Sequence, residues 1–254
     1  MDLSLKNKVF LISGGAKGIG RAISETLQLE GAIPVIIDPS KEVGKLVLGK
    51  GCGLHIPLRL ETPADSESAV NHAFSTFGRI DGLVNNAGTN DRVGLEQGNP
   101  EAFARSVQKN LMHYYELAHF SLPYLKKSKG SIVNISSKTA ITGQGGTSGY
   151  VAAKGAQLAL TREWAAELLP YQIRVNAVIP AEVFTPLYEN WLNSFSQPEE
   201  KLNEITHRIP LGKRMTTPQE IANMVVFLLS EKASHITGQQ LFVDGGYTHL
   251  DRAL

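Results

Sequence analysis

Short apolar runs alternate along the chain with longer stretches in which apolar residues recur every three or four positions. The short runs are KVFLISG, IPVIID, GLHIPLRL, RIDGLVNNAG, SIVNIS, QIRVNAVIP and QQLFVDGG. Runs of this kind are typical of strands buried on both faces, and the spacing between them is typical of amphipathic helices. The alternation predicts an α/β fold, with a seven-stranded parallel sheet covered by helices on both faces.

Several intervening segments have clear helical signals. Residues 63–78 begin with a proline and end at a glycine, which favours a helix. We expect one long helix over 100–127, another over 148–169, and a short helix with a loop between Pro39 and Gly53. Residues 186–214 interrupt the alternation and have about the right length for a lid over a binding site.

Length and composition favour one domain spanning 1–254. The chain has 254 residues, of which 42% are hydrophobic and 19% are charged, enough for a large core.

A formal net charge of +1 provides no electrostatic field that would attract nucleic acid. Cys52 is the only cysteine, so no internal disulfide or cysteine metal cluster forms, and no metal is expected. Without a signal peptide or an apolar run of about 18 residues, a soluble cytoplasmic protein is expected.

A glycine-rich turn follows the first apolar run. Gly14, Gly18 and Gly20 stand between a predicted strand and a predicted helix, where a backbone without side chains can approach a pyrophosphate at the helix N-terminus. Asp38 ends the second predicted strand, at the position where a carboxylate accepts both adenosine ribose hydroxyls and repels a 2′-phosphate. NAD is therefore expected rather than NADP, although Lys17 in the turn favours the phosphate.

The fourth predicted strand runs into a small amide-rich loop of Asn85, Asn86, Ala87 and Gly88. The loop is either an ordinary turn or a surface for a flat adenine or ribose. We favour the cofactor interpretation because of its context.

The stretch from Ser137 to Lys154 carries the candidate chemistry. Tyr150 and Lys154 are four residues apart, so a helix places both on one face. A tyrosine has an ordinary pKa of roughly 10, and an adjacent ammonium is expected to lower it. Ser137 follows a predicted strand, where its hydroxyl can bind a substrate oxygen. Asn110 lies inside a predicted helix, where an asparagine often faces solvent. If it is buried instead, it can free a backbone carbonyl that holds a water molecule, and this water would give Lys154 a path for protons.

These motifs together resemble the classical short-chain dehydrogenase/reductase family over nearly the whole chain. They are SGGAKGIG at 13–20, NNAG at 85–88, Asn110, Ser137, YVAAK at 150–154 and PAEVFT at 180–185. The resemblance implies a Rossmann fold and a nicotinamide cofactor. It also implies that Tyr150 is the acid/base, that Ser137 orients the substrate oxygen, that Lys154 binds the nicotinamide ribose and tunes Tyr150, and that Asn110 supports a proton relay.

The same matching implies a set of cofactor-binding residues, in which Val183 and Thr185 contact the nicotinamide carboxamide. The set is Gly14, Lys17, Gly18, Ile19, Gly20, Asp38, Leu60, Asn86, Ala87, Gly88, Tyr150, Lys154, Pro180, Val183 and Thr185. The chain departs from the family pattern at Ser13, which is usually threonine, and at Ala181, which is usually glycine. After the third strand, relatives have an aspartate that binds the adenine of the cofactor. This chain has residues 59–61 there, so the sequence leaves the contact with adenine undecided.

Polar residues near the predicted strand ends suggest a polyol substrate. The expected substrate-binding residues are Asn90, Ser137, Lys138, Gln144, Tyr150, Glu182 and Trp191, with Trp191 covering a sugar or ring face. Each of the loop residues could equally be an exposed side chain. Leu187, Leu192 and Phe195 offer apolar walls, which keeps steroid and acyl substrates open.

Three longer runs resemble the bacterial L-fucose dehydrogenase branch of the family. They are ISSKTAITGQGGTSGY, NAVIPAEVFTPLYENW and FVDGGYTHLDRAL. This resemblance implies that L-fucose or a related aldose is oxidised at its anomeric carbon to the lactone. The alternatives are a 3-oxoacyl-carrier-protein reductase, a hydroxysteroid dehydrogenase, and a catalytically silent redox sensor. The family usually forms homotetramers through the helices at 100–127 and 148–169 and the last strand, and the tail at 247–254 is expected to pack on a neighbour.

Overall fold

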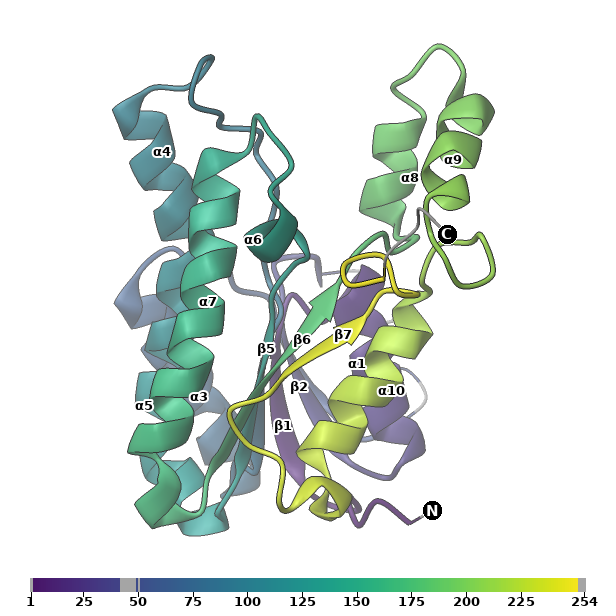
Figure 1. Ribbon diagram of the computed structural model, residues 1–254. Coiled ribbons are helices and arrows are strands. Elements are labelled where there is room, and N and C mark those ends of the chain that lie inside the picture. The colour runs from purple at the N-terminus through teal and green to yellow at the C-terminus, as the bar shows by residue number, and fades with distance from the viewer. Residues whose placement is uncertain (1, 42–48, 50, 251–254) are drawn as a thin grey trace.

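A seven-stranded parallel sheet forms the centre of the computed structural model, which describes residues 2–41, 49 and 51–250 (Figure 1). The sheet order is β3-β2-β1-β4-β5-β6-β7, and every neighbouring pair is parallel. This confirms the predicted fold class. The strands are β1 (Val9–Ser13), β2 (Ile33–Ile37), β3 (Leu54–Ile56), β4 (Gly82–Asn85), β5 (Ser131–Ile135), β6 (Arg174–Pro180) and β7 (Gln240–Val243).

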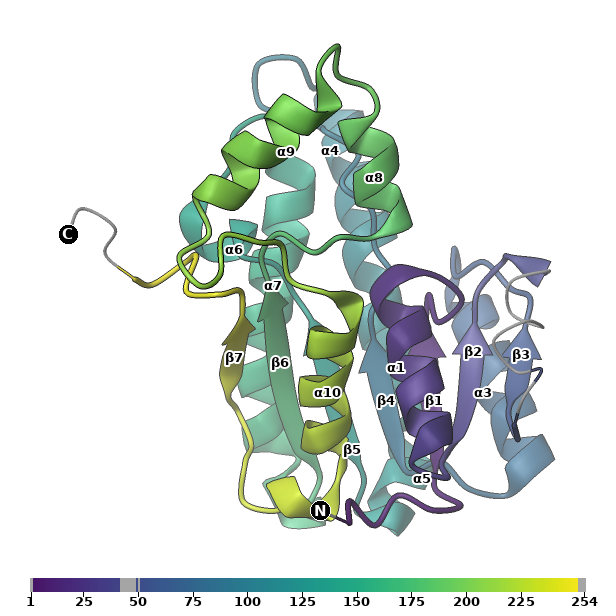
Figure 2. The same cartoon turned by 90° about the vertical axis from the view of Figure 1, so that its right-hand side faces the viewer.

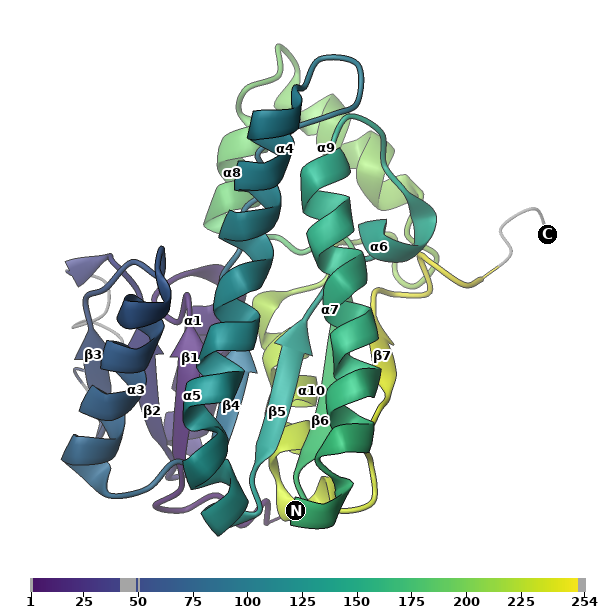
Figure 3. The same ribbon diagram turned by 90° about the vertical axis from the view of Figure 1, so that its left-hand side faces the viewer.

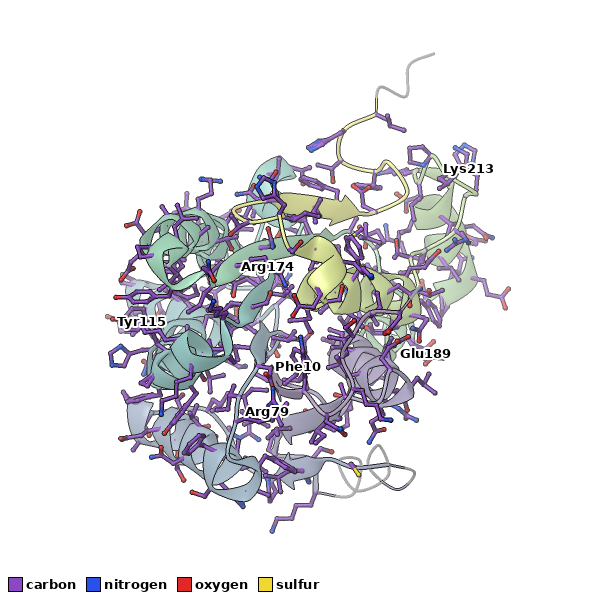
Figure 4. The ribbon with its side chains drawn as sticks, turned by 90° about the horizontal axis from the view of Figure 1, so that it is seen from below. Phe10, Arg79, Tyr115, Arg174, Glu189 and Lys213 are labelled. Carbon is purple, nitrogen blue, oxygen red and sulfur yellow. The ribbon has the colours of Figure 1, made fainter. Side chains whose placement is uncertain are left out.

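Helices cover both faces of the sheet because side chains alternate along each strand. Val9 and Leu11 belong to the core under α3 (Pro63–Phe77), α5 (His113–Ser128) and α7 (Ser148–Glu167), the layer nearest the viewer in Figure 3. Phe10 and Ile12 belong to the core under α1 (Gly18–Leu29) and α10 (Pro218–Leu229), shown in front in Figure 2. Phe10 lies near the middle of the molecule in Figure 4.

Helix α3 begins where its sequence signals place it. The Thr62 side chain accepts a hydrogen bond from the Asp65 amide, and the Asp65 carboxylate accepts one from the Thr62 amide. This reciprocal cap satisfies two donors that the first helical turn leaves free. At the other end, Gly78 adopts a left-handed φ of 70° and stops the helix.

Two predicted strands end earlier than expected. β2 ends at Ile37, so Asp38 stands just beyond the strand. β3 stops at Ile56 instead of extending through the run at 53–60, because Pro57 has no amide hydrogen to continue the ladder.

The expectation of one long helix over 100–127 was wrong in one respect. The segment is helical throughout, but a π-turn, η1 (Gln108–Met112), separates α4 (Pro100–Val107) from α5. Asn110 explains the interruption, since its Nδ2 donates to the Ser106 carbonyl at 2.9 Å and its Oδ1 accepts from the Thr89 amide at 2.8 Å. The side chain thus competes with the regular backbone ladder.

Three further helices stand beyond the carboxyl ends of the strands (Figure 1). They are α6 (Thr139–Thr142), α8 (Pro186–Leu192) and α9 (Pro198–His207), and the last two lie within the segment 186–214. Two 3₁₀ turns, η2 (Leu169–Tyr171) and η3 (Glu231–Ala233), complete the described elements.

Most of the expected helix between Pro39 and Gly53, and residues 251–254 of the expected tail, lie outside the described residues. No helix in the described part of the chain combines the length and the apolar character needed to span a membrane.

Candidate active site

A cavity of about 1070 Å³ opens at the carboxyl ends of the central strands. The turn between β1 and α1 forms part of its wall, with Gly14 and Gly18 at φ of 66° and 52°. A Cβ at Gly20 would lie 2.1 Å from the Gly14 carbonyl oxygen, so the turn tolerates no side chain there. Helix α1 has no side-chain cap at Lys17, which leaves its first amides available to an anion. The turn fits a pyrophosphate.

Asp38 lies on the same cavity, directly beyond β2. Its Oδ1 accepts from the Ser40 amide at 2.8 Å, and its Oδ2 lies 3.4 Å from the Ala16 amide. These contacts fix the carboxylate on the cavity wall. Lys17 lines the cavity as well.

Ser13 ties the loop after β4 to the glycine turn. Its Oγ accepts from the amides of Asn86 and Ala87 at 2.9 and 3.1 Å. The Asn86 Nδ2 donates back to the carbonyls of Ser13 and Gly14 at 3.0 and 3.1 Å. The Asn86 side chain therefore holds the two loops together, while the loop itself lines the cavity.

Nearly all of the expected cofactor residues come together on this cavity. Leu60 lines it and also packs against the core. Its neighbours Arg59 and Glu61 line it too but are mostly exposed, with their charged groups 3.6 Å apart. Gly20 is the one member that does not line it. The residues that do are Gly14, Lys17, Gly18, Ile19, Asp38, Leu60, Asn86, Ala87, Gly88, Tyr150, Lys154, Pro180, Val183 and Thr185.

Ser137, Tyr150 and Lys154 line the same cavity. Tyr150 and Lys154 share α7, and the Lys154 Nζ lies 5.5 Å from the Tyr150 ring centroid. The ammonium donates to the Ile135 carbonyl at 2.7 Å, where β5 ends. A hydroxyl, a phenol and a lysine thus face one space.

Burial dominates the ionisation of this cluster. It lowers the pKa of Lys154 to about 7 and raises the pKa of Tyr150 to about 12, although a hydrogen bond with Ser137 acts to lower the latter. The net lowering of the Tyr150 pKa that we expected is not seen, because burial outweighs the interactions that favour the phenolate. The loss of solvent disfavours the phenolate more than its neighbours stabilise it.

Asn110 lies behind the cavity and is completely buried. Its backbone carbonyl accepts a hydrogen bond from Gln157 Nε2 at 2.8 Å. Gln157 was missed in the sequence, although its position three residues after Lys154 on one helix was a usable signal.

Lys138 and Glu182, both expected to bind substrate, form an ion pair with little exposure. Tyr188 on α8 donates from its hydroxyl to Glu182 Oε2 at 2.7 Å, and the Lys138 Nζ lies 3.9 Å from the Tyr247 ring centroid. Burial and the Glu182 charge both raise the pKa of Tyr188. Tyr188 and Tyr247 were missed because they belong to no recognisable spacing, and Tyr247 is also distant in sequence from Lys138.

The other expected substrate residues lie elsewhere. Asn90 Oδ1 accepts from the Arg92 amide at 3.1 Å, and Gln144 is exposed in a glycine-rich loop. Trp191 packs edge-on against Tyr188 and Phe195, at centroid distances of 5.1 and 4.9 Å. Only Ser137 and Tyr150 of the expected substrate set line the large cavity.

Comparisons with known proteins agree with this arrangement. A family model described as "Enoyl-(Acyl carrier protein) reductase" matches residues 14–248. The L-fucose dehydrogenase of Rattus norvegicus is 37% identical over 241 residues, covering 94% of this chain and 88% of that protein. The 3-oxoacyl-[acyl-carrier-protein] reductase of Thermotoga maritima is 35% identical over 250 residues, covering 96% and 99%.

Two solved structures are also similar to this chain. The crystal structure of Cj0485 dehydrogenase has a TM-score of 0.95 at 49% identity, covering 100% of this chain and 99% of that one. The ligand-free aldohexose dehydrogenase of Thermoplasma acidophilum has a TM-score of 0.91 at 34% identity, with the same coverage. The chain therefore belongs to the short-chain dehydrogenase/reductase family, as a nicotinamide-dinucleotide-dependent dehydrogenase acting on CH–OH groups.

Proposed function

We propose that this protein oxidises the anomeric hydroxyl of L-fucose or a related aldose to the lactone, with NAD as the oxidant. The observation that carries the sugar assignment is the partly buried cluster of Lys138, Glu182 and Tyr188. The cluster adjoins the cavity, because Lys138 follows Ser137 and Tyr188 lines the cavity wall. Charged and hydroxyl groups in low-dielectric surroundings are suited to a polyol, whereas a steroid needs mostly apolar walls. Similar proteins named as L-fucose and aldohexose dehydrogenases support the same class.

In the proposed mechanism, Tyr150 is the general base and Ser137 orients the oxygen on C1. Tyr150, once deprotonated, would take the proton of the C1 hydroxyl as the C1–O bond becomes a carbonyl. A bound NAD⁺ would supply the acceptor for the hydride that C1 gives up, and its positive charge would favour the phenolate that burial disfavours. Lys154 holds the nicotinamide ribose and stabilises the phenolate, and Asn110 supports the relay of the proton.

The preference for NAD rests on Asp38, which lies on the cavity wall. A carboxylate there accepts both hydroxyls of an unphosphorylated ribose and repels a 2′-phosphate. Lys17, also on the cavity wall, would favour NADP by pairing with its 2′-phosphate. Its side chain is flexible, so we expect this attraction to be weaker than the repulsion from the fixed Asp38 carboxylate.

The segment 186–214 is proposed to be a substrate lid. Its helix α8 is joined to the cluster by the Tyr188–Glu182 hydrogen bond, and Trp191 packs against Tyr188 on the same helix. Asn90, Gln144 and Trp191 contact the sugar in this proposal only if the segments that carry them move toward Ser137.

A 3-oxoacyl-carrier-protein reductase is the second candidate. The reductase of Thermotoga maritima is a similar protein by name, and Leu187, which lines the cavity, is 64% exposed. An exposed apolar side chain at the entrance suits an acyl chain. A preference for NADPH would favour this candidate over the sugar dehydrogenase.

The test is the initial rate of NADH or NADPH formation, measured by absorbance across L-fucose, L-galactose, D-arabinose and steroid alcohols. We expect rapid oxidation of L-fucose with NAD. Tyr150→Phe should lower kcat by about 10²- to 10⁴-fold, the usual contribution of a general base. Tyr171→Phe is the matched control, because this tyrosine lies in η2 on the molecular surface.

Turnover confined to steroid or acyl substrates would contradict the sugar proposal while leaving the catalytic residues in place. Tight NAD binding without turnover of any alcohol would favour a redox sensor instead.

A further inference from the structure

A single buried amide joins the catalytic lysine to the π-turn. Gln157 lies one turn after Lys154 on α7 and is completely buried. Its Oε1 accepts from Lys154 Nζ at 3.2 Å, and its Nε2 donates to the Asn110 carbonyl at 2.8 Å. Only this orientation of the amide satisfies both partners, because an ammonium can only donate and a carbonyl can only accept.

Other buried polar groups lie around Gln157. Thr161 donates from its hydroxyl to the backbone carbonyl of Gln157 at 2.7 Å and accepts from Asn134 Nδ2 at 3.0 Å. Burying a polar side chain is costly unless it is hydrogen-bonded, and an apolar residue would fill the same space without that requirement. Packing alone therefore does not account for a glutamine beside Lys154.

The charge of Lys154 is stabilised by dipoles rather than by an anion. Its titratable neighbours are Tyr150 on its own helix and His113 and Tyr114 on α5, with the Tyr114 hydroxyl 3.3 Å from Nζ. All three are neutral near pH 7, because burial raises the pKa of both tyrosines and lowers that of His113. The ammonium donates to three neutral oxygens, the Ile135 carbonyl, the Gln157 Oε1 and the Tyr114 hydroxyl.

We propose that Gln157 is a positioning residue that keeps Lys154 in its charged form and anchors it to the backbone carbonyl of Asn110. The amide makes the contact with this carbonyl that the sequence led us to expect from a water molecule. The inference rests on the proposed roles of Tyr150 and Lys154. If Gln157 loses its acceptor atom, the ammonium is less stable, its field at Tyr150 weakens, and the phenolate forms only at higher pH.

The test compares Gln157→Met with Leu158→Met, two substitutions that place the same side chain at adjacent buried positions of α7. Leu158 is a control because it packs with Ala177 and Ile179, on β6. The readout is the pH profile of kcat/KM, with whichever alcohol the wild-type enzyme oxidises. In Gln157→Met, we expect the acidic limb to move about one pH unit higher, as loss of a hydrogen bond to a charged group implies.

At pH 7, kcat of Gln157→Met should fall about 10-fold, because one pH unit changes the phenolate fraction tenfold. KM for the alcohol should stay within about twofold, since Gln157 does not line the cavity. Leu158→Met should keep the wild-type profile. Gln157→Leu, which also removes both hydrogen bonds, replaces Gln157→Met if that variant does not fold.

A Gln157 variant whose pH profile superimposes on those of the wild type and Leu158→Met would overturn the inference, leaving Gln157 a packing residue. Full activity in Tyr150→Phe would instead contradict the proposed function on which the inference rests. The two failures are therefore distinguishable.

Discussion

His113 shows how the burial of a titratable side chain can make stability depend on pH. The residue is 4% exposed, and its Nε2 lies 3.2 Å from the Ala87 carbonyl. Burial lowers its pKa from 6.5 to about 4, the hydrogen bond to Ala87 acts to raise it, and the charge of Lys154 lowers it further. Between these pH values the unfolded chain binds more protons than the folded chain, so stability is lost as the pH falls from about 6.5 to 4.

We expect the free energy of unfolding in urea to fall by about 2 kcal/mol between pH 7 and pH 5 through His113 alone, because one pKa unit corresponds to about 1.4 kcal/mol. In His113→Gln this part of the pH dependence should disappear. His72→Gln, at an exposed position of α3, should retain it. Equal pH dependence in both variants would contradict the assignment to His113.

At the scale of elements, a side-chain hydrogen bond connects helix α8 of the proposed lid to the segment beyond β6. Tyr188 on α8 donates to Glu182, which lies just beyond β6 and is paired with Lys138 beyond β5. We expect Tyr188→Phe to raise KM for the sugar about 10-fold with little change in kcat, because loss of a hydrogen bond to a charged group costs about 1.5 kcal/mol and loosens α8.

Steady-state kinetics and limited proteolysis within 186–214 measure this effect. Ser194→Ala is the control, since its hydroxyl donates only to the nearby Trp191 carbonyl. Should kcat fall instead while KM stays constant, the Tyr188 hydroxyl would act in the chemical step rather than on the lid.

At the scale of the whole molecule, apolar side chains are exposed on the helices through which the family usually assembles. Tyr115 on α5 is 51% exposed and lies at the outer edge of the molecule in Figure 4, and Phe103 on α4 is 40% exposed. We expect a homotetramer in light scattering after size exclusion, and Tyr115→Asp should reduce the measured mass. Leu29→Asp, at an exposed position of α1, should not. A wild-type monomer at micromolar concentration would contradict the prediction.

The sequence by itself determined the features that depend on local spacing. The alternation of apolar runs was sufficient for seven parallel strands, because burial on both faces leaves a pattern in each strand. The glycine turn and the Tyr150–Lys154 pair were likewise visible, since their residues are close in the chain and belong to a single turn or helix.

Only the tertiary structure decided the features that depend on distant contacts. The Asn110 side chain in the π-turn is held by the Thr89 amide as well as by the nearby Ser106 carbonyl, and the Lys138–Glu182 pair gains Tyr188 and Tyr247 from later segments. The pKa values of Tyr150 and Lys154 likewise depend on parts of the fold that are distant in sequence. The cost of burying a charge depends on how much of the whole fold excludes water from it, which the spacing of two residues on a helix does not reveal.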